Sequence, residues 1–107
     1  MINVLICDDD QYMRKMLRKI VSENTSITNV YDTEDGIKAL DIVQEHIINI
    51  ALLDMDMPKL NGIETAKLIS TISPSTRFVF ITAHADYALD SFTVHPYDYL
   101  LKPVDID

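Results

Sequence analysis

Three acidic side chains, in two separate parts of this sequence, are placed to act together. Asp8 and Asp9 directly follow the apolar run Ile2–Cys7, and Asp54 directly follows the apolar run Ile50–Leu53. If these runs are neighbouring parallel strands, the three carboxylates meet at one sheet edge and repel one another. A hard divalent cation relieves that repulsion, and Mg²⁺ prefers oxygen ligands while keeping several waters. Such a cation also neutralises the charge of an incoming phosphoryl group.

Two further polar residues are expected at the same edge. Thr82 ends the predicted strand Phe78–Ile81, and Lys102 follows the predicted strand Tyr99–Leu101. Their hydroxyl and ammonium groups can donate hydrogen bonds to phosphoryl oxygens. Simpler roles stay open at this stage: the acids could cap the helices that follow them, Thr82 could cap a short helix predicted from Ala85, and Lys102 could pair with a carboxylate.

The elements that must position these residues alternate between strand and helix. Besides the four strands named above, of which Tyr99–Leu101 is short, a weaker strand is predicted at Thr28–Tyr31. Apolar residues at spacings of three and four predict the intervening helices: Met13, Met16, Leu17, Ile20 and Val21 in the first, Ile37, Leu40, Val43 and Ile47 in the second, and Ile63, Ala66, Ile69 and Ile72 in the third. Asp10 and Thr33 are the predicted N-caps of the first two helices.

This alternation is typical of a parallel sheet with right-handed crossovers. Five strands predict a doubly wound α/β sheet of the flavodoxin-like order 2-1-3-4-5. Ligands bind such sheets at the carboxyl ends of the strands, where the strand order reverses. The reversal falls between the first and third strands, directly beside the acidic residues.

Composition limits the classes of protein to consider. The 107 residues suffice for one domain, and 48% of them are hydrophobic, so a core can form. No apolar run approaches the ~20 residues that span a bilayer, and the N-terminus lacks the features of a signal peptide. The single cysteine, Cys7, excludes an internal disulfide and favours a cytoplasmic protein. The net charge of −8 argues against direct contact with nucleic acid and fits a basic partner or a metal ion.

Four motifs in chain order carry a family resemblance. They are Ile6-Cys7-Asp8-Asp9-Asp10, Leu53-Asp54-Met55-Asp56-Met57-Pro58 with Asn61-Gly62, Ile81-Thr82-Ala83, and Asp98-Tyr99-Leu100-Leu101-Lys102-Pro103. Each motif is weak alone, but each follows a predicted strand and they occur in order over essentially the whole chain. The sequence thereby resembles the CheY-like receiver domain of two-component response regulators.

The resemblance implies a phosphoacceptor and a metal site. Asp54 would accept a phosphoryl group from the phosphohistidine of a sensor histidine kinase. Asp9, Asp54 and the backbone carbonyl of Asp56 would ligate Mg²⁺, with Asp8 reaching it through water. Such a domain is not an enzyme acting on other molecules, because it promotes only its own phosphorylation and dephosphorylation.

The resemblance also implies a conformational switch. Lys102 would contact the phosphoryl group, and Thr82 would move toward it. The space that Thr82 leaves would let Tyr99 rotate inward and change the surface that an output domain recognises.

The segments 85–92 and 98–103 are similar to receivers of LytTR-type regulators, which usually carry a C-terminal DNA-binding domain. Family receivers usually continue through a fifth helix, whereas this chain ends at Asp107. The expectation is a receiver domain over 1–107 that stops before that helix. An apolar patch left uncovered there would favour self-association, including a homodimer.

Three alternative classes of protein share some of these features. A phosphohydrolase of the haloacid-dehalogenase type also pairs aspartates as in Asp54-Met55-Asp56, but after its first strand and without a proline at position 58; turnover of a phosphate ester would reveal it. A flavodoxin would bind flavin, but Asp8-Asp9-Asp10 would repel its phosphate. A receiver-like interaction domain that is never phosphorylated is disfavoured by the complete set of acids with Thr82 and Lys102.

Overall fold

The computed structural model describes residues 1–81 and the backbone of residues 82 and 98–101. Strands and helices alternate along the described chain, as predicted. They are β1 (Asn3–Cys7), α1 (Gln11–Ser22), β2 (Asn29–Thr33), α2 (Gly36–Glu45), β3 (Ile50–Asp54), α3 (Gly62–Ile72), β4 (Arg77–Thr82) and β5 (Asp98–Leu101). The short helix predicted from Ala85 to Phe92 lies outside the described residues.

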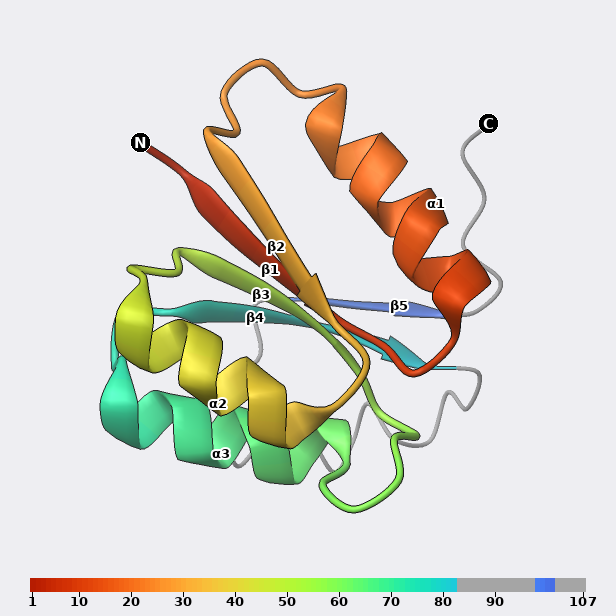
Figure 1. The fold of residues 1–107 in the computed structure, drawn as a ribbon, viewed down its shortest axis with the longest axis vertical. Helices are drawn as coiled ribbons and strands as arrows, with labels where there is room; N and C mark the ends of the chain where they lie inside the picture. The colour runs from red at the N-terminus through yellow and green to blue at the C-terminus, as the bar shows by residue number, and fades with distance from the viewer. Residues whose placement is uncertain (83–97, 102–107) are drawn as a thin grey trace.

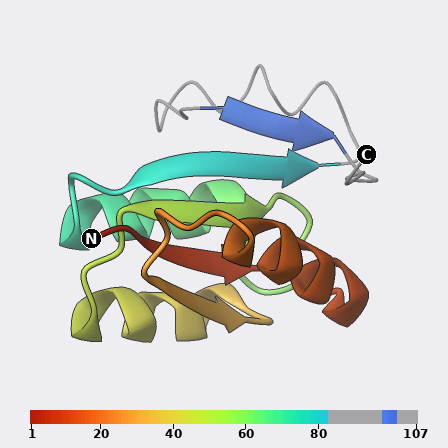
Figure 2. The ribbon, with the colours of Figure 1, turned by 90° about the horizontal axis from the view of Figure 1, so that it is seen from above.

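The strands form a parallel sheet whose order reverses beside β1. β1 pairs with both β2 and β3, and β4 follows β3, which confirms the predicted order 2-1-3-4 for these strands. The backbone of β5 pairs with the outer side of β4 (Figure 2). Cys7 pairs with Leu53. Asp8 and Asp54 come directly after these two residues, so both lie at the same sheet edge.

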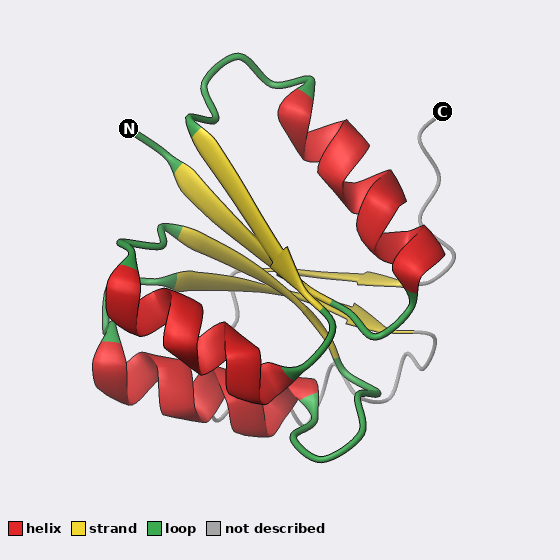
Figure 3. Cartoon of the chain, viewed as in Figure 1, coloured by secondary structure: helices red, strands yellow, loops and turns green. Residues whose placement is uncertain are grey.

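Helices cover both faces of the sheet. Within the described residues, α1 lies on one face and α2 and α3 lie together on the other (Figures 1 and 3). The larger core, between the sheet and α2 and α3, includes Leu5, Val43, Leu53, Ile69 and Phe80. A smaller core under α1 includes Val4, Ile6, Met13, Leu17 and Ile81. Burial on both faces explains why β1 is apolar at every position after Asn3 rather than alternating.

Polar side chains fix the start of each helix. Asp10 caps α1 by accepting hydrogen bonds from the amides of Tyr12 and Met13, as predicted. The predicted N-cap Thr33 of α2 is wrong: Thr33 ends β2, and Asp35 caps the helix by accepting from the amide of Lys38. Thr33 comes two residues too early, because the chain stays extended until Asp35.

Three isoleucines of the predicted apolar stripes are exposed rather than packed in the core: Ile37, Ile47 and Ile72. Ile47 lies beyond the end of α2 at Glu45, so the helical period no longer applies to it. Ile37 and Ile72 lie in terminal turns of their helices, away from the buried middle of each stripe, where Val43 and Ile69 pack. No helix within the described ranges is long and apolar enough to cross a lipid bilayer.

Candidate functional site

Three carboxylates converge at the point where the sheet order reverses. One carboxylate oxygen from each of Asp8, Asp9 and Asp54 lies within 4.8 Å of the other two. Asp8 and Asp54 are buried, and Asp9 is exposed. The predicted convergence of these side chains is confirmed, although Asp54 is more than forty residues from Asp8 and Asp9 in sequence.

Backbone hydrogen bonds hold the turn that carries Asp8. Its amide donates to the carbonyl of Thr33 (3.1 Å), which extends the pairing of β1 with β2. Its Oδ1 accepts from the amide of Asp10 (2.8 Å). The guanidinium of Arg14 donates to the Asp8 carbonyl (2.8 Å), and its Nε lies 4.0 Å from a carboxylate oxygen of Asp32. The turn after β1 is therefore tied to both β2 and α1.

Asp54 is fixed in a similar way at the end of β3. Its Oδ1 accepts from the amide of Asp56 (3.1 Å), which limits rotation of the carboxylate. The amide of Met55 donates to the carbonyl of Ile81 (3.0 Å), so the ladder with β4 continues one residue past Asp54. The side chain of Asp56 is exposed and is not one of the three clustered carboxylates.

The capping alternative for these acids is not supported. The N-caps of the helices that follow β1 and β3 are Asp10 and Asn61, not Asp8, Asp9 or Asp54. Since other residues cap the helices, the three clustered carboxylates are not explained by helix capping.

The donor set fits a hard divalent cation. All three clustered groups are carboxylates, which offer only acceptor oxygens when ionised. Mg²⁺ and Ca²⁺ prefer such ligands, and the exposed Asp9 leaves the cluster open to solvent on one side. Two buried acids beside one exposed acid are thus compatible with a small cation that keeps part of its water.

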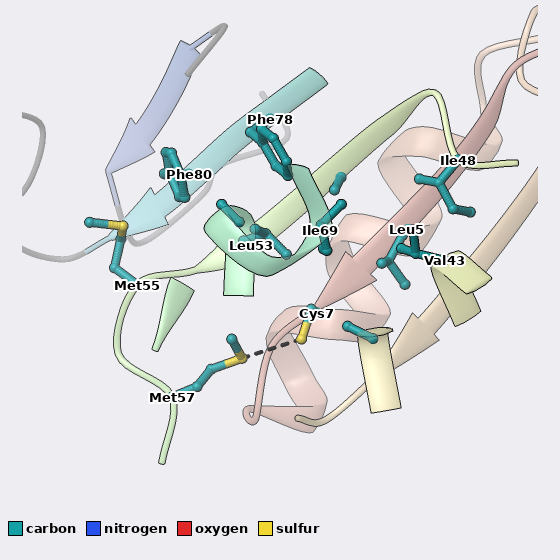
Figure 4. Close-up of a cluster of buried hydrophobic side chains, with 13 residues drawn as sticks. Leu5, Cys7, Val43, Ile48, Leu53, Met55, Met57, Ile69, Phe78 and Phe80 are labelled. Carbon is teal, nitrogen blue, oxygen red and sulfur yellow. Dashed lines mark hydrogen bonds between the residues drawn. The ribbon is translucent and has the colours of Figure 1, made fainter. Parts of the chain in front are cut away.

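The nearby thiol of Cys7 is not suited to bind such an ion. It is fully buried and donates a weak hydrogen bond to the sulfur of Met57 at 3.3 Å (Figure 4). Burial, reinforced by the negative charges of Asp35, Asp8 and Asp54, raises the pKa of Cys7 to about 12. Cys7 is therefore a neutral packing group that joins the end of β1 to the loop after β3.

The remaining predicted site residues are only partly described. The backbone of Thr82 ends β4, directly after Ile81, which pairs with Asp54. Tyr99 lies within β5, where its backbone pairs with Phe80. The side chains of Thr82 and Tyr99, and Lys102 as a whole, lie outside the described residues, so their roles stay predictions.

Two residues of the site were not singled out by sequence reasoning. Arg14 supports the turn after β1, and a basic residue one turn into the helix after an acidic motif was a usable signal for it. Gly62 belongs to the Asn61-Gly62 pair of the second family motif, but the motif predicts no role for it. Its packing against the backbone of Asp54, eight residues earlier, is a contact that apolar periodicity does not report.

Comparison with known families decides the class of protein. The family described as the response regulator receiver domain matches residues 4–107. This chain belongs to that family. It is therefore the receiver domain of a response regulator in a two-component system, a class of signalling protein that works with sensor histidine kinases and output domains.

Relatives of this receiver domain include full-length regulators. An uncharacterized response regulatory protein of Yersinia pestis is 36% identical over 105 residues, which cover 98% of this chain and 44% of the relative. The transcriptional regulatory protein BtsR of Escherichia coli is 35% identical over 107 residues, covering 98% of this chain and 44% of BtsR. The receiver domain thus spans less than half the length of the curated relatives it matches.

Solved structures show the same fold. The REC domain of AraT, a response regulator from Geobacillus stearothermophilus, is similar with a TM-score of 0.87 and 29% identity, covering 96% of this chain and 82% of that one. The response regulatory domain of mrkE from Klebsiella pneumoniae gives a TM-score of 0.87 and 28% identity, covering 97% and 85%. Since Asp54 ends β3 of a receiver fold, neither the haloacid-dehalogenase nor the flavodoxin alternative is supported.

Proposed function

We propose that this receiver domain accepts a phosphoryl group on Asp54 from the phosphohistidine of a sensor histidine kinase, in a reaction that depends on Mg²⁺. The observation that carries the proposal is the convergence of Asp8, Asp9 and Asp54 at the carboxyl edge of a receiver-type sheet. Of the three, Asp54 ends the central strand β3 and is held at one oxygen by the amide of Asp56. A carboxylate with a fixed orientation is prepared to act as a nucleophile.

The transfer balances without any further reactant. A carboxylate oxygen of Asp54 attacks phosphorus, the bond between phosphorus and the histidine nitrogen breaks, and the electron pair leaves with that nitrogen. The product is an acyl phosphate on Asp54. Its added negative charge and acceptor oxygens would be met by the hydroxyl of Thr82 and the ammonium of Lys102.

Asp9, Asp54 and the backbone carbonyl of Asp56 would hold Mg²⁺, with Asp8 acting through a water molecule. The bound ion would neutralise the charge that gathers on the phosphoryl oxygens. The protein's own contribution is to bring the ligands together before the donor arrives. The hydrogen bonds to Asp8 Oδ1 and Asp54 Oδ1 do this by fixing both carboxylates.

The phosphorylated state would act through Thr82 and Tyr99 on an output domain. The family resemblance favours a DNA-binding domain of the LytTR type, and BtsR is by name a transcriptional regulator. In this proposal residues 1–107 belong to the receiver unit, work in the cytoplasm without membrane contact, and leave contact with DNA to the output domain. A homodimer would be a natural way to switch such an output.

The proposal is tested by incubating the protein with Mg²⁺ and a small phosphodonor such as acetyl phosphate. The wild type should gain the mass of one phosphoryl group, and hydroxylamine should remove it because it cleaves acyl phosphates. Asp54→Asn should gain nothing. Asp10→Asn is a matched control, since asparagine caps α1 as well as aspartate and this residue is outside the cluster. Undiminished labelling of Asp54→Asn would refute the proposal.

A further inference from the structure

Gly62, the first residue of α3, touches the peptide that carries Asp54. A Cβ atom at this position would lie 2.5 Å from the Asp54 carbonyl oxygen, 3.0 Å from its carbonyl carbon and 3.0 Å from Cα of Met55. All three are backbone atoms, so no side chain can rotate away to make room. Any larger residue at position 62 must displace either the start of α3 or the end of β3.

The start of α3 resists displacement. Asn61 Oδ1 accepts from the amide of Glu64 (2.9 Å), and Glu64 Oε1 accepts from the amide of Asn61 (3.1 Å), which completes a capping box. One and two turns further along, Ala66 and Ile69 are fully buried in the larger core. A side chain at position 62 would therefore push mainly on the chain that follows β3.

That stretch of chain leads directly to the carboxylate of Asp54. The amide of Gly62 donates to the carbonyl of Met55 (3.3 Å), the amide of Met55 donates to Ile81, and the amide of Asp56 donates to Asp54 Oδ1. These bonds join into one network around the peptide after Asp54. A shift imposed at Gly62 would change the direction of the Asp54 carboxylate and of the Asp56 backbone together.

We infer that Gly62 is a positioning residue for the carboxylate cluster: its missing side chain lets α3 abut the Asp54 peptide and so sets Asp54 relative to Asp8 and Asp9. The inference deepens the proposed function and rests on it for its consequences in phosphoryl transfer. The geometric consequence, an altered Mg²⁺ site, can be measured separately.

The test compares Gly62→Ala with Gly36→Ala, because these are the two glycines of the chain and each opens a helix. A Cβ at Gly36 would lie 2.3 Å from Thr65 Oγ1 and 3.1 Å from Cβ of Leu60, which are both side-chain atoms. Moving the buried Thr65 hydroxyl would break its hydrogen bond to the carbonyl of Asn61 (2.8 Å), but would place no atom against the Asp54 backbone. Both variants should therefore be destabilised, but only Gly62→Ala should press on the backbone of Asp54. Three quantities are measured: stability in urea, Mg²⁺ affinity by calorimetry, and the amide NMR signals of Met55 and Asp56 in metal-free protein.

Gly62→Ala should bind Mg²⁺ at least about tenfold more weakly, as do variants that lose a partner orienting a metal ligand. It should also be labelled more slowly by acetyl phosphate and show shifted Met55 and Asp56 signals without metal. Gly36→Ala should keep its Mg²⁺ affinity within about twofold. Equal weakening in both variants, or unchanged affinity and signals in Gly62→Ala, would overturn the inference.

Two further outcomes are separable. If the wild type binds Mg²⁺ but Asp54 is never labelled, the proposed function fails, while the affinity and amide signals still decide the role of Gly62. If Gly62→Ala does not fold, Asn61→Ala loosens the start of α3 by removing the capping box without adding an atom. It should then weaken Mg²⁺ binding more than Gly36→Ala does, and equal affinities would refute the inference.

Discussion

The two ends of the sheet each carry a cluster of short polar side chains, asparagines at the amino end and aspartates at the carboxyl end. At the amino end, Asn3, Asn29 and Asn49 gather. Asn29 Nδ2 donates to Asn3 Oδ1 (3.0 Å), Asn3 Nδ2 donates to the carbonyl of Ile47 (2.7 Å), and Asn49 Oδ1 accepts from the amide of Asn3 (2.8 Å). At the carboxyl end, Asp8, Asp9 and Asp54 gather within 4.8 Å of one another.

The difference lies in what each group can donate. An amide both donates and accepts, so a cluster of amides can form a closed network that joins strands and loops. An ionised carboxylate only accepts, so a cluster of carboxylates needs an outside donor or cation. The amino end is thereby suited to stabilising the fold, and the carboxyl end fits the proposed binding of a cation. Four predictions test this contrast.

The largest effect is expected when a charge enters the amino end. Asn3→Asp would place a buried carboxylate against the Ile47 carbonyl, so that two acceptors would meet where an amide donates in the wild type. The variant should lose about 3–5 kcal/mol of the free energy of unfolding. Urea unfolding at neutral pH measures this loss. Lowering the pH should recover part of it, because a protonated carboxyl can donate as the amide did. Asn29→Asp, at an exposed position of the same cluster, should lose much less.

The next effect concerns ligand binding at the carboxyl end. Asp8→Asn should weaken Mg²⁺ binding about 10–100-fold, because it removes one charge from the cluster. The wild-type unfolding temperature should rise with added Mg²⁺, as expected for a ligand that binds only the folded state, and this rise should largely vanish in the variant. The folded fraction of Asn3→Asp should still show a rise in unfolding temperature with added Mg²⁺. A full Mg²⁺ response in Asp8→Asn would break the contrast between the two ends.

A smaller effect should follow from a neutral change at the amino end. Thr76 is buried and donates through Oγ1 to the carbonyl of Ile48 at 2.7 Å. Thr76→Val keeps the shape but removes the donor, so it should cost about 1–3 kcal/mol in urea unfolding. The loss should be the same with and without Mg²⁺, since the residue is remote from the carboxylates.

The smallest effect is expected for a surface ion pair. The ammonium of Lys38 bonds the carboxylate of Glu34 on an exposed surface, and this hydrogen bond lowers the pKa of Glu34 and raises the pKa of Lys38. The pair's contribution would be lost as pH falls through the lowered pKa of Glu34, or rises through the raised pKa of Lys38. Because both groups are exposed, Lys38→Ala should leave the unfolding midpoint at neutral pH unchanged within error. A clear fall in the unfolding midpoint of Lys38→Ala would show that exposed charges also contribute to stability, contrary to this prediction.

Much of the fold could be predicted from local sequence patterns. The apolar runs that end at Cys7 and Leu53 predict strands, and the described structure confirms both. Local patterns fail at the ends of elements. They predict a cap at Thr33 where Asp35 caps the helix, and they extend the apolar stripe to Ile47 although the helix ends at Glu45. Helix ends are decided by competing hydrogen bonds within a few residues, which apolar periodicity does not record.

The sequence alone determined which groups are available, namely carboxylates directly after two apolar strands. It also determined the alternation of strands and helices, which brings the carboxyl ends of both strands to one edge of a parallel sheet. It determined this because strand period and crossover handedness are local and chiral properties of the chain. Only the tertiary structure decided that Asp8 and Asp54 are buried together, that Cys7 packs on Met57, and that α3 abuts the Asp54 peptide at Gly62. The first two contacts join residues far apart in the chain, and the third closes the loop between β3 and α3. All three are fixed by how the elements pack together rather than by any adjacent residue.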